Sequence, residues 1–216
     1  EFTDNDEAFM ATQMSTRTEM LSAAETFIGR VRDLFAQGLD DQAVWTKACV
    51  HLRDLLADDD LKRHASTWPD SLALEGKPSN LLFYEDPDYG FVLNALIKAP
   101  NLKTSVHDHG KSWTLYGVLE GGESVTRFTR TDDGPQVPEA ATLVEAATHD
   151  VVPGYIDFVP PWVIHQETNT DQRTIGFIVR SQRSGTFVQN RFNPEKGAVD
   201  QYDGPVQMPY QLSWAE

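Results

Sequence analysis

The chain has 216 residues, of which 40% are hydrophobic, 10% aromatic and 24% charged, and its net charge is −15 at pH 7. This length and balance fit a folded domain with a continuous core and exclude a disordered chain. Acidic residues outnumber basic ones throughout, by 15 to 7 in residues 1–75 and by 18 to 11 in residues 76–216. Because neither part has a basic stripe, we expect no nucleic-acid partner and no anionic membrane surface as a partner.

The sequence carries few signs of export or membrane insertion. No apolar run approaches the roughly 18 residues of a membrane span, and no secretory signal stands near the start, so we expect a cytoplasmic protein. Because the sequence opens at Glu1 without a Met, we also expect a trimmed N-terminus. Cys49 is the single cysteine, which excludes an intrachain disulfide framework.

Residues 1–75 predict helices. The segment Thr16–Glu19 has a capping-box pattern, apolar residues follow at helical spacing, and Gly38 is a typical stop. A second helix is predicted after Asp40 or Asp41, with one apolar face. Because two short amphipathic helices hold little core of their own, we expect residues 1–75 to pack on a larger body.

Residues 76–216 predict that larger body. The apolar period changes to two, and Gly/Pro turns separate short runs that read as strands. The predicted strands are Phe91–Ala99, Trp113–Leu119, Ser124–Thr129, Tyr155–Val159 and Thr174–Val179. Many short strands without intervening helices indicate an antiparallel sandwich or barrel. The tail from Asn193 is rich in Pro, Gly and polar residues, and we expect it to wrap the surface.

The segment His107-Asp108-His109 is the first candidate for chemistry. Residues i and i+2 of a strand share a face, so both imidazoles can reach one point inside the barrel, while Asp108 points away. Imidazole is a common ligand for Fe, Zn, Cu and Ni. Because such pairs also occur by chance in surface loops, a third histidine has to decide between a metal site and a loop.

His165 supplies the third imidazole, within a segment that resembles the second sequence motif of the cupin superfamily, G-x5-P-x-G-x2-H-x3-N. Gly154, Pro160, His165 and Asn169 match this motif, and Trp162 replaces its inner glycine. His149, just before the motif, is predicted to be a surface or turn histidine and not a fourth ligand.

The first cupin motif, G-x5-HxH-x3,4-E-x6-G, is also matched in part. His107, His109 and Gly121 fit the x4 spacing, Asn101 replaces the leading glycine, and Thr114 stands where the motif has its glutamate. The resemblance covers roughly residues 80–180. It implies a mainly β protein with a single cupin barrel, a double-stranded β-helix of jelly-roll type, preceded by N-terminal α-helices.

The absence of the motif glutamate resembles the three-histidine branch of cupins. That branch includes thiol dioxygenases such as cysteine dioxygenase, and some diketone- and ring-cleaving dioxygenases. The resemblance implies a mononuclear non-haem Fe(II) site at His107, His109 and His165, although Mn, Ni or Zn also accept imidazole ligands. Three neutral ligands leave the ion its full charge, so we expect O2 and a small anionic chelating substrate, a thiolate or an enolate, as partners.

The chain departs from thiol dioxygenases in two places. The arginine that they usually carry one strand before HxH is absent from Pro78–Leu81, and their Ser-x-His-x-Tyr arrangement is replaced by Gly176–Arg180. Both departures argue against cysteine as the substrate. If strand alternation holds, Arg180 takes the place of the tyrosine and points inward to fix an anionic group; the alternative is a strand-end arginine that reaches solvent.

Strand alternation also suggests a pocket lining. Tyr116 is predicted to face the cavity and orient a bound oxygen species, although a buried core tyrosine would fit the same pattern. Thr114 and Ile178 are predicted to line the substrate pocket, together with Trp113 and Trp162, which flank the ligands and could instead serve packing alone.

The sequence therefore predicts a cupin dioxygenase and leaves two alternatives open. One is an oxygen-independent, metal-dependent cupin lyase or isomerase; such relatives usually retain the glutamate that Thr114 replaces. The other is a non-catalytic cupin that binds a small molecule, with histidines that serve structure. A homodimer is the family expectation for oligomeric state.

Overall fold

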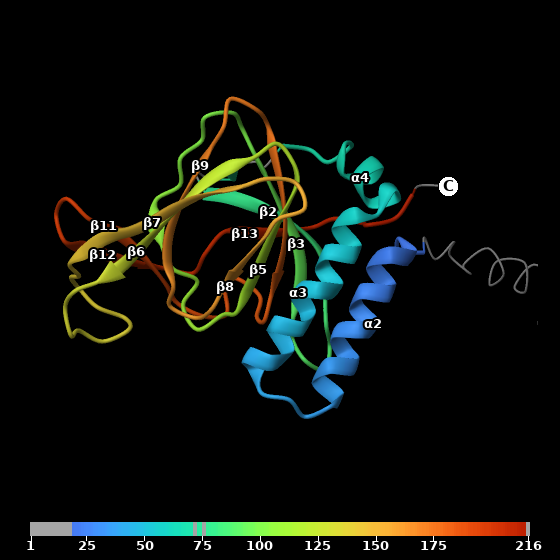
Figure 1. Cartoon of the computed structure of the whole chain (residues 1–216), viewed down its shortest axis with the longest axis horizontal. Helices are drawn as coiled ribbons and strands as arrows, with labels where there is room; N and C mark the ends of the chain where they lie inside the picture. Colours follow the sequence, from blue (N-terminus) through green and yellow to red (C-terminus); the bar gives the residue numbers. More distant parts are fainter. Residues whose placement is uncertain (1–18, 71–72, 75–76, 215–216) are drawn as a thin grey trace, which may run out of the picture.

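A computed structural model describes residues 19–70, 73–74 and 77–214 of the chain. Three helices come first in this described part: α2 (Ser22–Ala36), α3 (Asp41–Ala57) and α4 (Asp59–Ala65). They lie together on one side of the β-structure (Figure 1). None of the described helices is both long and apolar enough to cross a membrane.

Local chemistry sets the helix ends. The Asp40 side chain accepts a hydrogen bond from the Ala43 N–H at 2.8 Å and caps α3, so Asp40 and not Asp41 is the cap of the two that the sequence allowed. Gly38, with a φ of 66°, follows the last turn of α2 in the left-handed conformation that ends many helices. The predicted capping box at Thr16–Glu19 lies outside the described residues except for Glu19, and α2 begins at Ser22 without a side-chain cap.

The strands form two sheets. In chain order they are β1 (Ala73–Leu74), β2 (Lys77–Glu85), β3 (Val92–Lys98), β4 (Val106–His107), β5 (Thr114–Glu120), β6 (Glu123–Arg130), β7 (Leu143–Val151), β8 (Ile156–Val159), β9 (Ile164–Asn169), β10 (Thr174–Arg180), β11 (Gln189–Asn193), β12 (Ala198–Tyr202) and β13 (Val206–Pro209). The first sheet has the order β1-β2-β3-β10-β5-β8, with β13 also paired to β2, and the second has the order β12-β11-β4-β9-β6-β7.

This strand order is that of a jelly roll. Within β3 to β10, one sheet takes β3-β10-β5-β8 and the other takes β4-β9-β6-β7, all antiparallel. Cupins belong to this double-sheet class. The expected fold is confirmed: a mainly β, cupin-like structure follows N-terminal helices. The described strands make two separate sheets and not one closed barrel.

The predicted strands appear as β3, β5, β6, β8 and β10, each within one residue of its expected ends. The tail after Asn193, for which the sequence predicts a surface wrap, forms two further strands. β12 pairs with β11, and β13 pairs in parallel with β2, so the tail adds a strand to each sheet. Pairing satisfies backbone groups that an unpaired tail would leave to solvent.

The outer face of the first sheet packs on the helices. Side chains that alternate along β3, β5 and β10 join the helical residues in one apolar cluster, among them Leu93, Ile97, Leu115, Phe177, Trp45 and Leu52. Gly117 allows the closest approach, because a Cβ there would lie 2.3 Å from the Leu56 Cδ1 atom. The opposite, inner face of the same strands meets the second sheet, where Tyr116 and Ile178 pack with Val125.

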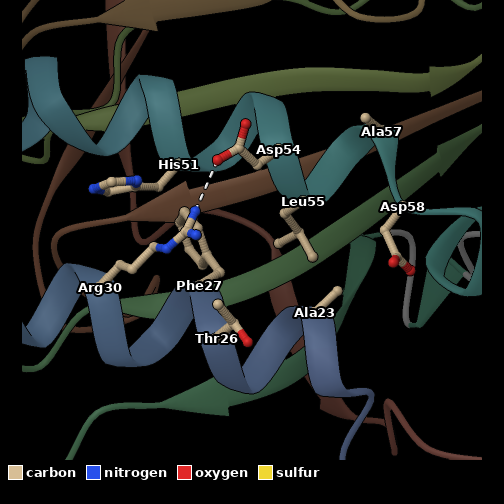
Figure 2. A pocket seen from close by; sticks show the side chains of 9 residues that line it. All are labelled: Ala23, Thr26, Phe27, Arg30, His51, Asp54, Leu55, Ala57 and Asp58. Carbon is tan, nitrogen blue, oxygen red and sulfur yellow. Dashed lines mark hydrogen bonds and ion pairs between the residues drawn. The ribbon is translucent and has the colours of Figure 1, made fainter.

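Two ion pairs mark the helical layer. Arg32 of α2 binds Asp86, in the loop between β2 and β3, at 2.6 Å, and this carboxylate also accepts the N–H groups of Asp88 and Tyr89. Figure 2 shows a groove between α2 and α3, with the exposed pair of Arg30 and Asp54 at 2.7 Å. None of the residues predicted to bind metal or substrate lines this groove.

Candidate metal centre

Three histidines converge between the two sheets. His107 ends β4 and lies directly opposite His165 on β9, and His109 follows two residues later. One ring nitrogen of each lies within 4.8 Å of those of the other two, and the Nε2 atoms of His109 and His165 are 3.4 Å apart. All three rings are almost fully buried. The three histidines that the sequence predicts as ligands therefore form a compact metal-binding group.

Two of these imidazoles, His109 and His165, are held neutral. Burial, followed by the charge of Arg180 and the neighbouring histidines, lowers the pKa of His109 well below its usual value. Burial also lowers the pKa of His165 to about 3, although Glu167 opposes it. The Nδ1 atom of His107 lies 2.9 Å from the Ser105 carbonyl and donates there, so Nε2 is the ring nitrogen left to face a metal. Neutral nitrogen donors suit Fe(II) and the other ions that prefer imidazole.

Backbone conformation explains why the two motifs have glycine at these positions. Gly121 and Gly154 have φ values of 79° and 88°, and the replacements Asn101 and Trp162 have φ values of 58° and 66°. All four positions are therefore left-handed, a conformation that glycine adopts without steric cost. For a tryptophan it is strained, and such strain concentrates at functional sites. The Trp162 N–H donates to the Gly110 carbonyl at 2.8 Å, which ties the two motifs together.

A buried carboxylate adjoins the histidines, and the sequence analysis missed it. The Glu167 Oε1 atom lies 4.0 Å from His165 Nε2, and its Oε2 atom lies 4.0 Å from His107 Nδ1 and accepts from the Thr104 hydroxyl at 2.6 Å. The metal-binding group itself contains the three histidines alone, as the sequence predicts, and Glu167 lies beside it on β9 and not at the position of Thr114. The signal was present: Glu167 follows His165 by two residues and shares its inward face.

The environment keeps Glu167 charged. Burial alone would raise its pKa, but the rings of His165 and His107, Lys98 and the Thr104 hydroxyl outweigh burial and hold the pKa below its usual range. The metal group therefore carries a fixed negative charge beside it.

Arg180 points inward. It is 5% exposed, and it lies opposite Thr114 across the β5–β10 pair. Its Nη1 donates to the Ser184 hydroxyl at 2.8 Å, its Nε has no partner, and it forms no ion pair with the described residues. The alternative of a side chain that reaches solvent does not fit this burial. The Thr114 hydroxyl is likewise buried without a hydrogen-bond partner.

Tyr116 lies beside a buried ion pair. Lys98 and Glu123 form that pair, and the Lys98 Nζ atom lies 5.0 Å from the Tyr116 ring centroid. Gly176 makes room for the ring, because a Cβ there would lie 2.4 Å from both Cε2 and the hydroxyl of Tyr116. Burial, and then the charge of Glu123, raises the pKa of Tyr116 well above its usual value. The phenol is therefore protonated near neutral pH.

The predicted pocket residues separate into two groups. Ile178 packs in the inner cluster with Tyr116, on the side of the metal group. Trp113 does not: it packs against Phe158, with ring centroids 5.6 Å apart, in the cluster under the helices. The pocket role predicted for Trp113 is wrong, because the alternation that points Thr114 inward points Trp113 outward.

Two further polar residues lie outside the histidine group. Asp108 accepts from the N–H of Gly110 and from the backbone and side chain of Asn190, so it turns away from the histidines. His149 lies on β7, partly exposed and outside the histidine group, and its Nε2 is 3.6 Å from an Asp157 oxygen.

No family model matches the sequence, and neither does any curated protein. Among solved structures, the chain is similar to the DMSP lyase DddQ from Ruegeria pomeroyi DSS-3, with a TM-score of 0.36 and 13% identity over 50% of this chain and 46% of that one. It is also similar to a recombinant oxalate oxidase in complex with glycolate, with a TM-score of 0.34 and 17% identity over 43% of this chain and 42% of that one.

A third similar structure is the Schizosaccharomyces pombe Cnp3 cupin domain, with a TM-score of 0.38 and 11% identity over 52% of this chain and 66% of that domain. The chain thus spans less than half of the lyase and the oxidase that it matches. The cupin-like fold and the metal-binding group are established by strand order and side-chain geometry.

Proposed function

We propose that the protein is a mononuclear non-haem Fe(II) dioxygenase that uses O2 to oxidise a small anionic substrate. The observation that carries this proposal is the buried three-histidine group beside Arg180, a buried cation without an ion pair among the described residues. His107, His109 and His165 would hold the ion. Fe(II) at such a site supplies open coordination positions for an anionic substrate and one-electron chemistry with O2.

Arg180 would position the substrate. A buried charge without a partner costs several kcal/mol, on the order of the penalty for breaking a buried ion pair. A substrate carboxylate or enolate would remove that cost and gain a bidentate hydrogen bond from the planar guanidinium. Binding energy at Arg180 would therefore orient the substrate relative to the histidines.

Tyr116 would act as a hydrogen-bond donor. Its hydroxyl is buried near the Glu123 carboxylate, and burial together with this acid raises its pKa and keeps the proton on the oxygen. Lys98 and Gly176 fix the plane of the ring. Thr114 and Ile178 would line the substrate cavity, and Trp162 would limit the entry of water.

A second function is favoured by Glu167. An oxygen-independent lyase or isomerase needs a base and a metal in one site, and this carboxylate lies 4.0 Å from two of the three histidines. In that reaction Glu167 would take a proton from carbon, and the protonated Tyr116 would give one to the leaving group.

Oxygen consumption by the Fe(II)-loaded protein tests the proposal. The panel contains thiols, β-diketones and hydroxylated aromatics, each with and without a carboxylate. We expect O2 uptake with at least one anionic chelating compound, and its loss to the background rate in His107→Ala and His165→Ala. His51→Ala, on α3, is the matched control and retains the full rate.

The outcomes separate the functions. Uptake that persists in His165→Ala contradicts the metal site, and product formation at equal rates without O2 replaces the dioxygenase with the lyase. Metal and ligand binding without any turnover would indicate a binding protein.

A further inference from the structure

Four buried amide side chains of the described residues have no partner: Gln189 on β11 of the second sheet, and three in the first sheet. Both polar side-chain atoms of Asn80, Asn94 and Gln207 are buried and form no hydrogen bond with the described residues. Asn94 is 0% exposed, Asn80 1% and Gln207 8%. Leaving a buried polar group unsatisfied costs about 1–3 kcal/mol, and such groups are rare in folded proteins. Three of them together indicate that something outside the chain satisfies them.

The three amides are neighbours on the inner face of the first sheet. Gln207 on β13 lies beside Asn80 on β2 in the parallel register. Asn94 on β3 lies opposite Leu82, which places it diagonally next to Asn80. Because Leu81 and Leu93 belong to the cluster under the helices, the residues next to them along the chain point inward. We call these three residues the amide row.

The amide row leads towards the metal group. Asn94 lies opposite Ile178 on β10, which in turn lies opposite Tyr116 on β5. Arg180 is two residues along β10 from Ile178, on the same face. The row therefore extends from the two predicted catalytic side chains across β3 and β2 to β13.

The amide row carries no charge, so the group that binds it should be uncharged as well. The other buried cations of the interior are matched, Lys98 by Glu123 and Arg127 by Asp157. An amide offers two donors and an acceptor with two lone pairs, which suits an uncharged hydroxyl or amide more than a charge or an apolar tail.

We propose that the amide row binds an uncharged hydrogen-bonding group at the far end of the substrate, while Arg180 holds the anionic end. The substrate class is then a small carboxylate that bears a distal hydroxyl or amide. The assignment of the anionic end rests on the proposed function, whereas the polar subsite depends only on the amide row.

Two matched probes test the subsite by binding alone. 4-Hydroxybutyrate and valerate have the same number of non-hydrogen atoms and differ in a terminal hydroxyl against a methyl group. Dissociation constants are measured by calorimetry on the Fe(II)-loaded protein without O2. We expect 4-hydroxybutyrate to bind at least tenfold more tightly, a difference typical of sites built to hydrogen-bond a hydroxyl.

Variants assign the preference to the row. Asn94→Leu, close in shape and apolar, should bring the affinity ratio to near one and leave valerate binding within about threefold. Its unfolding temperature should equal or exceed that of the wild type, because the change removes an unsatisfied buried amide. Asn80→Leu should also lower the ratio and serves if Asn94→Leu does not fold. Gln37→Leu, an exposed amide at the end of α2, is the control that leaves the ratio unchanged.

The outcomes are separable from those of the proposed function. Arg180→Lys should weaken both probes and preserve their ratio. A wild type that does not prefer 4-hydroxybutyrate, or a preference that survives in both Asn94→Leu and Asn80→Leu, overturns the subsite and assigns only water to the amide row. A preference that is present in a protein without O2 uptake keeps the subsite and rejects the dioxygenase.

Discussion

The two faces of the first sheet are built from alternate residues of the same strands, yet they differ in chemistry. On β10, Phe177 and Val179 are fully buried against the helical layer, while Ile178 and Arg180 face the second sheet. The outer face is apolar, and the inner face holds ions and unpartnered amides. The difference indicates that the outer face supplies stability and the inner face supplies chemistry.

The two faces contribute to the free energy of folding in opposite directions: apolar burial on the outer face stabilises the fold, and burial of polar groups on the inner face costs stability. Each large apolar side chain buried under the helices contributes about 1.5–3 kcal/mol. Buried ions such as Lys98 and Glu123 give up hydration that their mutual attraction often repays only in part. The helical layer therefore offsets the cost of a polar interior, and changes on the two faces should have different consequences.

The largest effect on stability is expected from breaking the inner ion pair. Lys98→Met leaves Glu123 buried without its cation and should lower the free energy of unfolding by about 3–5 kcal/mol at pH 7. Burial raises the pKa of Glu123, so the loss should diminish as the pH falls and the carboxyl takes up a proton. Urea denaturation at several pH values measures the loss in the free energy of unfolding and its dependence on pH. The double variant Lys98→Met with Glu123→Gln should recover most of the loss; a single variant as stable as the wild type would show that the pair is unimportant.

Two glycines allow a direct comparison of the faces. Gly117→Ala directs its methyl group at Leu56 on the outer face and should destabilise by about 1–3 kcal/mol through overpacking, with the turnover of folded protein unchanged. Gly176→Ala directs its methyl group at the Tyr116 ring and should lower turnover at least about tenfold, with metal content unchanged. Denaturation and rate measurements that give the two variants the same profile would remove the distinction between the faces.

The smallest effect is expected at the ion pair between Arg32 of α2 and Asp86. Contacts with Tyr89, Arg32 and Tyr84 outweigh burial and lower the pKa of Asp86 from 3.8. A carboxyl whose pKa is lower in the folded than in the unfolded state stabilises the fold at pH values above its unfolded-state pKa. This stabilisation is lost as the pH falls through the folded-state pKa. Asp86→Asn should therefore cost about 1 kcal/mol at pH 7, and its difference from the wild type should shrink below about pH 3.8. Denaturation from pH 7 to pH 3 tests this, and a constant difference contradicts it.

Short sequence patterns correctly predicted the features that depend on neighbouring residues alone, namely helix ends and the alternation of side chains along strands. The cap at Asp40, the stop at Gly38 and the strand alternation that turns Arg180 inward all follow from short-range geometry. The convergence of His107 and His165 required the motif resemblance, because 57 intervening residues carry no local signal of contact.

What the sequence did not predict depends on partners from elsewhere in the fold. The Lys98–Glu123 pair joins two sheets, and neither residue shows in isolation that it will be buried. β7 was missed because this edge strand is largely exposed and lacks apolar alternation. Trp113 and Glu167 were different: consistent use of the alternation would have placed the first outward and the second inward.

Metal stoichiometry tests the central claim most directly. The wild type and the matched histidine variants are loaded with Fe(II) or Co(II), desalted and analysed for metal per chain, with the Co(II) absorption spectrum as a second readout. We predict one ion per chain in the wild type and in His51→Ala, and less than about a tenth of that in His109→Ala. One ion per chain retained by His109→Ala, or none bound by the wild type, would contradict a metal centre at the three histidines.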